Sequence, residues 1–486
     1  MHAYLRAVRG WFSQSGFRRD AAVLFTSTAL ARVLLVLTMP LVARQFVPGD
    51  VGHWQLFVSL GTVIGAIVCL RYEVAIPLPQ DEPKARQLAA AAMFVALAGT
   101  LLLSLVIVIG RDTFVRWIAS PELTPYLWYL PLMALLIGAE QIATYWLTRT
   151  GDFTSQGVSR LLKSAFSVAL PLAMAVALGA KLSYLIIGTL VGQAAATVYI
   201  ARRDVWRAFK QSIDSAQRAG MFTAMREYKN YPLYVAPYAF IGQFAKRLVL
   251  LLLATYAGAS AVGCFAMAMQ ITFVPITFVT GSLSQAFYRR ASMHADLREL
   301  EKLVLKVLGL QIIGAVPAFT LLIVHSEYLM RLVLGPGWGE TAAYVAWLAP
   351  ASLSVFLTSW LDRMLDKLGQ QRSAVIMQLS FDALSLGMLF LGLRVWHSTL
   401  LGIAAYCCMT VVYSTGWLLV AFGKAGYSFK ALGKLAVLGA LLAGAVVAIH
   451  LLLGGALRQP FGLITETLCA AMMALVTLRL TRKHLV

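Results

Sequence analysis

Seven ionisable side chains stand inside stretches of sequence that otherwise carry almost no charge. They are four cations and three acids: Arg32, Arg71, Lys246 and Arg247, and Glu73, Glu140 and Asp382. A cation in an apolar setting is a binding group for an anion, and arginine in particular matches the paired oxygens of a phosphate or diphosphate. An acid in the same setting can couple an ion or act as the counter-ion of a base. The solvent around these stretches decides between such roles.

The composition identifies that solvent as a lipid bilayer. The 486 residues are 60% hydrophobic and 13% charged, with a mean hydropathy of +0.76, whereas soluble proteins contain about 25% charged residues. Apolar runs of about 20 residues recur, each long enough to cross a hydrocarbon core as a helix. The first run lacks the cleavage pattern of a secretory signal and is expected to be retained. We predict about fourteen spans, at 21–46, 53–78, 87–110, 125–149, 157–179, 183–201, 233–256, 261–285, 303–325, 341–361, 373–395, 398–422, 435–453 and 461–479.

The placement of lysine and arginine predicts the orientation. If the N-terminus is cytoplasmic, most of the 41 lysines and arginines fall in inside segments, as the positive-inside rule requires. Both termini are then cytoplasmic. The same placement explains the net charge of +20, because basic residues at the membrane edge meet anionic headgroups. Nucleic acid is therefore not expected as a partner.

Two halves are predicted on either side of a basic, polar stretch after the sixth span. The segment ARQFVPGDVGHWQL at 43–56 aligns with ATYAGASAVGCFAM at 254–267 and pairs Gly52 with Gly263. Internal duplication of this kind is common in transporters. We therefore predict an all-α integral membrane protein with two pseudo-symmetric six-helix lobes around a central cationic cavity, plus two extra C-terminal helices. The predicted limits are 1–203 for the N-lobe, 204–231 for a cytoplasmic linker, 232–422 for the C-lobe and 423–486 for the appended helices.

The four cations are the predicted substrate-binding residues. Burying a charge at the bilayer centre costs about 2.5 to 3.5 kcal/mol, so such a residue faces a wet cavity or a partner. Arg32 lies near the middle of the first span, and Lys246 and Arg247 lie at similar depth in the first span of the second lobe. Arg71 lies toward the cytoplasmic end of its span. These positions predict a cavity suited to a phosphate or diphosphate group.

The three acids have two possible roles each, namely ion coupling and charge neutralisation. Glu73 is close enough to Arg71 to belong to a structural anchor, so this pair is either an anchor or a part of the binding site. Glu140 begins a polar face with two threonines, and Asp382 follows Gln378 by one helical turn. Either acid is an ion-coupling site or a counter-ion, for example of Lys246 or Arg247.

Several chemistries have no matching motif. The sequence contains no GxxxxGK[ST] loop, HExxH, CxxC or GxSxG, so it predicts neither an ATP-driven pump nor a known catalytic site. The five cysteines have no metal-ligand spacing and are expected to be small core residues. We predict a protein that is not an enzyme and that uses no cofactor or metal.

Two segments resemble a known family. Residues 41–79 and 228–292 resemble Wzx-like oligosaccharide flippases of the polysaccharide transporter family, which belongs to the multidrug, oligosaccharidyl-lipid and polysaccharide exporter superfamily. The matching features are Pro-Gly-Asp-Val-Gly at 48–52, Arg-Tyr-Glu at 71–73 followed by Ala-Ile-Pro, Tyr-Pro-Leu-Tyr at 231–234 with Pro237, and Val-Gly at 262–263.

The resemblance implies a fold with two lobes around a central cavity. It implies flipping of a polyprenyl-diphosphate-linked oligosaccharide, such as an O-antigen or exopolysaccharide repeat unit, to the periplasmic leaflet of a bacterial inner membrane by alternating access. Related lipid II flippases use cavity arginines in the first, second and seventh spans, which here contain Arg32, Arg71 and Arg247. The implied partners are the undecaprenyl-diphosphate type of glycolipid, membrane lipids, and a glycan polymerase with its chain-length machinery.

Three other functions are compatible with parts of the sequence. A cation-coupled multidrug exporter of the same superfamily would share the fold and use an acidic cavity. A membrane glycan polymerase or ligase would need a larger outside loop than the short segments near 111–124 and 326–340. A scaffold of a glycan-assembly complex would have no use for buried cations.

Overall fold

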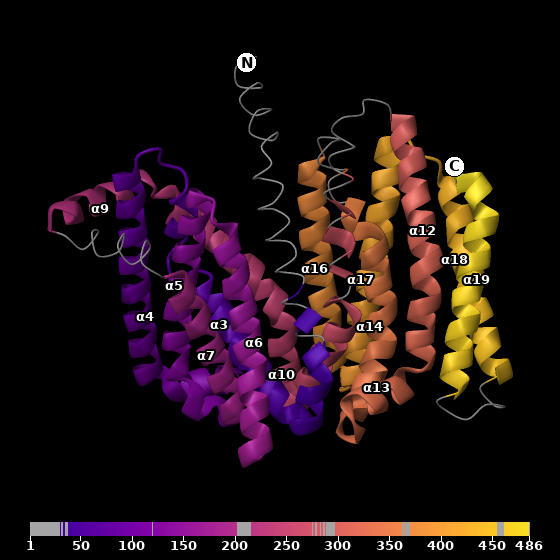
Figure 1. The fold of residues 1–486 in the computed structure, drawn as a ribbon, viewed down its shortest axis with the longest axis horizontal. Helices are drawn as coiled ribbons and strands as arrows, with labels where there is room; N and C mark the ends of the chain where they lie inside the picture. Colours follow the sequence, from indigo (N-terminus) through magenta and orange to yellow (C-terminus); the bar gives the residue numbers. More distant parts are fainter. Residues whose placement is uncertain are drawn as a thin grey trace. The chain divides into compact units, whose positions relative to one another are not determined.

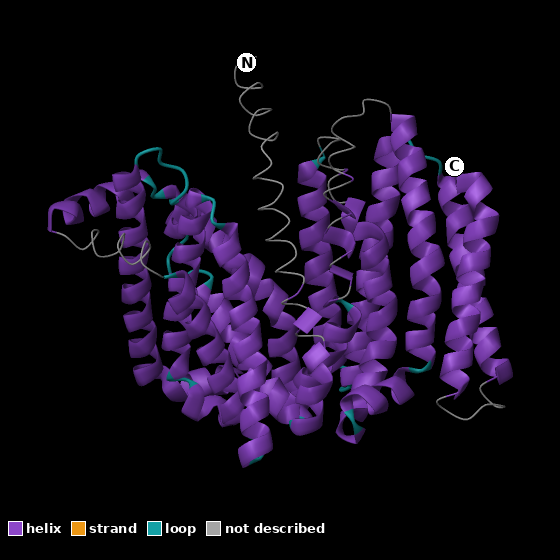
Figure 2. Cartoon of the chain, in the orientation of Figure 1, coloured by secondary structure: helices purple, strands orange, loops and turns teal. Residues whose placement is uncertain are grey.

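In the computed structural model, the described residues form helices joined by loops and turns, with no strand among them (Figure 2). It describes residues 37–118, 120–201, 215–274, 297–361, 370–453 and 461–485, with short pieces at 30, 33–34, 276–277, 279–281, 283–284, 287 and 364. Within these residues, eleven helices are long and apolar enough to cross a membrane. The predicted all-helical, multi-pass membrane fold is thus confirmed, while the number of about fourteen spans stays a prediction.

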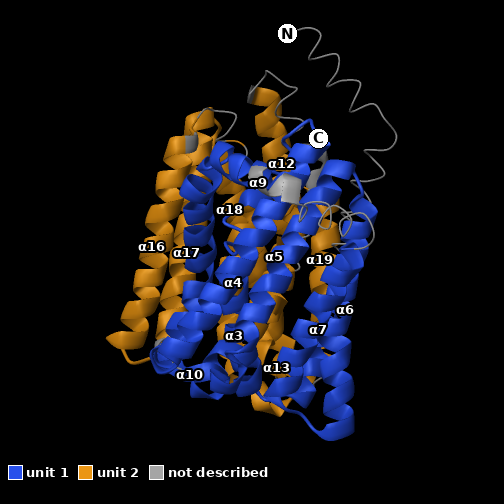
Figure 3. Ribbon diagram, turned by 90° about the vertical axis from the view of Figure 1, so that its left-hand side faces the viewer, with its two compact units in different colours: residues 1–263 blue, residues 264–486 orange. Residues whose placement is uncertain are grey.

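Two compact units divide the chain, residues 1–263 and 264–486 (Figure 3). The limits predicted for two lobes, a linker and an appended pair stay a prediction. The first unit contains the following helices, which are labelled in Figure 1: α3 (Pro48–Gly65), α4 (Glu82–Ile118), α5 (Tyr129–Thr150), α6 (Phe153–Leu178), α7 (Leu182–Ile200), α9 (Ser215–Glu227) and most of α10 (Ala236–Thr272). Short helices of other types lie at Tyr72–Ala75, Pro121–Tyr126 and Tyr231–Val235.

The second unit contains the end of α10 and a further set of helices. They are α12 (Leu297–Val324), α13 (Ser326–Leu334), α14 (Gly339–Thr358), α16 (Gln371–Arg394), α17 (Thr399–Ala425), α18 (Phe429–Leu453) and α19 (Phe461–Leu485), with short turns at Pro336–Trp338 and Ser359–Leu361. The α18–α19 pair packs on α12 through apolar side chains that include Leu321, Val446 and Ala470.

Small residues bring α6 and α7 into close contact. Gly188 and Gly192 form a GxxxG motif on α7, the spacing that lets helix backbones approach in membranes. A Cβ atom on Gly188 would lie 2.2 Å from Pro171, and one on Gly192 would lie 2.3 Å from Ser167 and 2.6 Å from the carbonyl oxygen of Lys163. No side chain fits at either position without moving α6.

The predicted span at 53–78 is wrong from residue 66 onward. The helix α3 ends at Gly65, and a short 3-10 turn occupies Tyr72–Ala75. Between them, Leu70 and Arg71 have φ angles of 48° and 64°, a left-handed conformation that cannot continue a right-handed helix. The broken segment packs into a buried cluster with residues of α4 and α5. An irregular turn can lie at membrane depth when it is buried in protein, but not when its backbone is exposed to lipid, which cannot satisfy its polar groups.

The two aligned turns of the internal repeat pack against each other within the first unit. A Cβ atom on Gly52 would lie 1.8 Å from the carbonyl oxygen of Ala259, and one on Gly263 would lie 2.0 Å from the carbonyl oxygen of Pro48. In the predicted alignment, Gly52 corresponds to Gly263 and Pro48 to Ala259, so the contact is reciprocal. Gly258, with φ of 83°, kinks α10 just before this contact. The alignment therefore relates positions that meet in space.

Candidate functional site

Arg71 and Glu73 form an ion pair at the break after α3. The Nη1 atom of Arg71 lies 3.4 Å from Oε1 of Glu73, and the Glu73 side chain has no exposed surface, whereas that of Arg71 is 20% exposed. Between them, the hydroxyl of Tyr72 donates a hydrogen bond of 3.2 Å to the carbonyl oxygen of Met225 on α9. The turn is thereby fixed to the helix that precedes α10.

Arg71 and Glu73 differ in how far their side chains are exposed. Glu73 has no exposed side-chain surface, and its Oε2 atom has no hydrogen-bond partner among the described residues. The same holds for Nε of Arg71. A carboxylate with no exposed surface cannot meet a ligand unless the turn moves, while the guanidinium of Arg71 keeps some surface. The geometry therefore gives Glu73 the position of a counter-ion and leaves Arg71 available.

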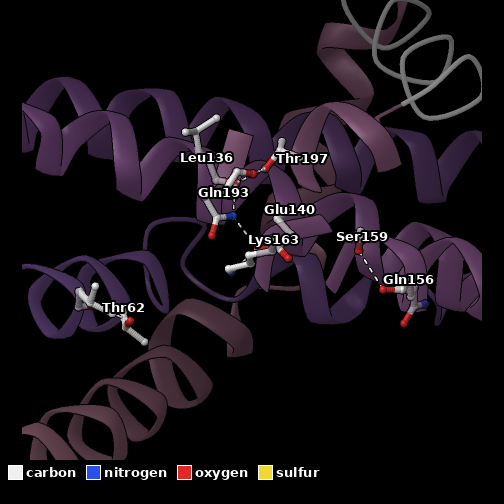
Figure 4. A network of polar contacts seen from close by, with 9 residues as sticks. Thr62, Leu136, Glu140, Gln156, Ser159, Lys163, Gln193 and Thr197 are labelled. Atoms are coloured by element: carbon white, nitrogen blue, oxygen red, sulfur yellow. Dashed lines mark hydrogen bonds and ion pairs between the residues drawn. The ribbon is translucent and has the colours of Figure 1, made fainter. Parts of the chain in front are cut away.

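Glu140 lies in a polar network that joins α5, α6 and α7 (Figure 4). Its Oε2 atom accepts hydrogen bonds from Nζ of Lys163 at 2.9 Å and from Nε2 of Gln193 at 2.6 Å. Thr197 donates to the carbonyl oxygens of Leu136, at 3.1 Å, and Gln193, at 2.9 Å. The GxxxG contact described above places Gln193 beside this pair. The counter-ion of Glu140 is thus Lys163, and Glu140 does not pair with a cation of α10.

The predicted polar face of α5 continues this network. Thr144 and Thr148 accept hydrogen bonds from Nε2 of Gln156, through the Thr144 carbonyl oxygen at 3.1 Å and the Thr148 hydroxyl at 3.0 Å. Ser159 in turn donates to the carbonyl oxygen of Gln156 at 2.9 Å. These polar groups satisfy one another between helices, so the described contacts of this face are structural.

Lys246 and Arg247 stand on α10, a helix that is otherwise apolar along most of its length. Adjacent residues on a helix project about 100° apart, and here Lys246 is exposed while Arg247 is half-buried. In the part of the chain that the structure describes, neither has an ion-pair partner. Both cations therefore have charge available for an anion.

Asp382 lies on α16 in the second unit and is exposed. Its Oδ1 atom accepts a hydrogen bond of 2.8 Å from Nε2 of Gln378, the neighbour predicted from the sequence, and Gln378 also accepts a hydrogen bond from the hydroxyl of Tyr413 on α17. No cation pairs with Asp382 among the described residues. Of the three acids, it is the one without a positive partner there.

Arg32 lies outside the described residues. Of the predicted site residues, the structure brings Arg71 and Glu73 into contact and places Lys246 beside Arg247. The reasoning from sequence missed two participants, Lys163 and Gln193. Lys163 falls within the predicted span at 157–179 but was not among the seven ionisable residues singled out; it lies on α6 and neutralises Glu140. A glutamine directly after the GxxxG motif of an apolar span was the available signal for Gln193.

The fold defines the class of this protein. The structure is similar to that of the lipid II flippase MurJ in an inward closed conformation, with a TM-score of 0.74 at 11% identity over 96% of this chain and 100% of that chain. It is also similar to an inward-facing multidrug resistance MATE family transporter of the MOP superfamily, with a TM-score of 0.60 at 17% identity over 81% and 94% of the two chains. The chain has the fold of these membrane proteins.

The sequence then defines the family. A family model described as polysaccharide biosynthesis protein matches residues 74–343, more than half of the chain. The chain belongs to this family of polysaccharide biosynthesis proteins. No curated protein matches the sequence. The resemblance predicted from residues 41–79 and 228–292 is confirmed at the level of family and fold.

Proposed function

We propose that this protein is a flippase for a polyprenyl-diphosphate-linked oligosaccharide. It would move the glycolipid from the cytoplasmic to the periplasmic leaflet of a bacterial inner membrane by alternating access. One observation carries the proposal: within the described residues, Lys246 and Arg247 have no counter-ion along an apolar helix of a chain that belongs to a polysaccharide biosynthesis family. In a protein of this family, such cations would bind the anionic lipid that carries the glycan.

The depth of these cations supports an anion as their ligand. Arg247 lies about 16 Å along α10 from the start of the helix at Ala236, at 1.5 Å per residue. That is too deep for a side chain to reach the headgroups easily, and an uncompensated charge there costs several kcal/mol. A diphosphate offers two groups of oxygens to adjacent cations and would offset that cost. A neutral solute would leave both charges uncompensated.

Each predicted residue then has a role in the proposal. Arg247 and Arg32, with Lys246, bind the diphosphate. Arg71 assists at the cytoplasmic entrance, held in place by Glu73. Orientation follows the lysine and arginine placement, with both termini in the cytoplasm. A glycan polymerase and its chain-length machinery would take the delivered repeat unit.

The reciprocal glycine contact supports alternating access. In the proposed orientation, the turns at 48–52 and 259–263 lie on the periplasmic side. Their close backbone contact, through Gly52 and Gly263, would close that side while the cytoplasmic side accepts the glycolipid. Opening would require these two turns to separate, and no side chain of either glycine would have to be displaced.

A cation-coupled drug exporter has less support. Such a protein needs an acid that is free to bind a proton or a cationic drug. Of the three predicted acids, Glu73 and Glu140 are paired with Arg71 and Lys163, so Asp382 is the one that lacks a positive partner among the described residues. Two cations without counter-ions on α10 would repel a cationic drug.

Transport of a fluorescent polyprenyl-diphosphate glycan in proteoliposomes tests the proposal. We expect the wild type to move the glycolipid between leaflets and Arg247→Ala to reduce the rate by roughly tenfold or more, since a lost charge-assisted contact is worth about 2 kcal/mol. Arg247→Lys keeps the charge and should retain a measurable rate. Arg331→Ala is the control, because Arg331 forms an exposed ion pair with Glu327.

Two results would contradict the proposal. One is a wild-type protein that moves no glycolipid but binds cationic drugs, which would favour the exporter. The other is an unchanged transport rate in Arg32→Ala/Arg247→Ala, which would remove these arginines from the mechanism. A native mass spectrum of the purified wild type should contain a glycolipid adduct that the double variant lacks.

A further inference from the structure

A second group of polar side chains lies in the second unit, apart from the cations and acids above. His325 directly follows α12, His450 lies in the last turn of α18, and Glu466 lies in the second turn of α19. Nε2 of His325 lies 2.7 Å from Oε2 of Glu466, and Nδ1 of His450 lies 3.2 Å from each carboxylate oxygen. The residue between α12 and α13 and the helices α18 and α19 thus each direct one side chain of a metal-ligand type to the same point.

The burial of this group calls for a positive charge. The side chains of Glu466 and His325 are 1% and 2% exposed, while that of His450 is 31% exposed. Removing a carboxylate from water costs several kcal/mol unless a positive charge compensates it. No lysine or arginine among the described residues pairs with Glu466. The compensating charge is either a proton on an imidazole or a cation between the three side chains.

We propose that His325, His450 and Glu466 bind a divalent transition-metal ion of the zinc class. One ligand atom from each residue lies within 4.8 Å of the other two. Zinc binds imidazole nitrogen and carboxylate oxygen at about 2.0 to 2.2 Å, so tetrahedral ligands lie about 3.4 Å apart. On binding, the separation of 2.7 Å would have to open by about 0.7 Å and that of 3.2 Å by about 0.2 Å.

The donor set selects the kind of metal. Two imidazoles and one carboxylate suit zinc and its transition-metal neighbours, whereas magnesium and calcium prefer oxygen ligands alone. Three protein ligands leave a fourth position for water. The exposed part of His450 provides the side from which the ion can enter.

The location indicates a structural role. The α18–α19 pair contacts α12 through apolar side chains such as Leu321 and Val446, and lipid tails would solvate those surfaces about equally well. A metal ion held by α18, α19 and the residue that follows α12 adds a directional link that lipid cannot replace. It would fix the C-terminal pair on α12, independently of the substrate that the protein moves.

Zinc content of the purified protein tests the site. The full chain, carrying an affinity tag without histidine, is incubated with zinc chloride in detergent, freed of unbound metal and measured by plasma mass spectrometry. We expect about one zinc ion per chain in the wild type. The variants Glu466→Gln and His450→Gln should lose that ion. His397→Asn should keep it, because His397 is an exposed histidine of the same unit outside the cluster.

Thermal unfolding separates metal binding from misfolding. Zinc should raise the unfolding temperature of the wild type and of His397→Asn, but not that of His450→Gln, and a chelator should reverse the shift. If Glu466→Gln does not fold, His450→Gln decides, because its side chain is the least buried of the three. Equal zinc content in the wild type and His450→Gln would overturn the proposal and leave a hydrogen-bonded triad.

Discussion

Glu73 is balanced by a single guanidinium, and that arrangement has a measurable cost when it is broken. The carboxylate has no exposed surface and its partner Arg71 is only 20% exposed. Removing one member of a buried ion pair leaves the other uncompensated, which costs more than the pair itself contributes. The turn that holds Arg71 should therefore depend on Glu73 even if Glu73 never touches a substrate.

We expect Glu73→Gln to lower the free energy of unfolding by about 3 kcal/mol, at the low end of the range for a buried pair. The measurement is the shift in thermal unfolding of detergent-solubilised protein. Glu327→Gln is the matched control, because the pair of Glu327 with Arg331 is 72% and 68% exposed and should contribute less than about 1 kcal/mol. Equal shifts for the two variants would mean that Glu73 is not a structural counter-ion.

At the residue scale, the sequence predicted which charges are unusual but not their partners. An ionisable residue in an apolar span is visible from hydropathy alone. Its partner depends on which helices meet, and Glu140 finds Lys163 and Gln193 from two different helices. Arg71 and Glu73 were predictable as a pair because only one residue separates them.

The close contact between α6 and α7 depends on glycines whose Cβ positions are already occupied by α6. We expect Gly192→Ala to destabilise the protein by about 1 to 3 kcal/mol, the usual cost of overpacking, because its Cβ would meet Ser167 and the carbonyl oxygen of Lys163. Gly314→Ala on α12 is the control, since a Cβ there meets nothing within 4 Å. Both variants gain helix propensity, so a difference in their unfolding temperatures isolates packing. Similar stability in both would contradict the tight α6–α7 contact.

The reciprocal turn contact makes a separate prediction. We expect Gly52→Ala and Gly263→Ala to impair glycolipid transport to a similar degree, because each added Cβ would overlap a carbonyl oxygen of the other turn. Gly49→Ala should transport normally, since Gly49 has open space around it in the same turn. Rates in proteoliposomes provide the measurement. Normal transport by both variants would argue against a periplasmic closure at this contact.

At the element scale, hydropathy predicted where helices occur but not where one breaks. The run at 53–78 is apolar apart from a few residues such as Arg71 and Glu73, so its summed hydropathy gives no sign of the helix end at Gly65. Leu70 and Arg71 adopt positive φ although neither is of the types that favour it, glycine, asparagine or aspartate. Tertiary packing of the turn against α4 and α5 imposes that conformation. The alignment of 43–56 with 254–267 related these two turns as a repeat, but it did not predict that they touch.

The distribution of lysine and arginine predicts an orientation for the whole molecule. We expect reporters fused to either terminus to behave as cytoplasmic, with a fluorescent protein active and alkaline phosphatase inactive. Phosphatase inserted after Gly179, in the exposed link between α6 and α7, should be active because this link is predicted to lie outside. Activity at a terminus would reverse the orientation and move the proposed entrance at Arg71 to the other side.

The ion pair between α5 and α6 also bears on how the protein enters the membrane. Glu140 is synthesised 23 residues before Lys163 and 53 before Gln193. At about 5 to 20 residues per second, Lys163 follows Glu140 by roughly 1 to 5 seconds. During that interval α5 carries an uncompensated acid, which lipid would disfavour. We therefore expect α5 to stay in the insertion machinery until α6 arrives, so that the two helices enter the bilayer as a hairpin.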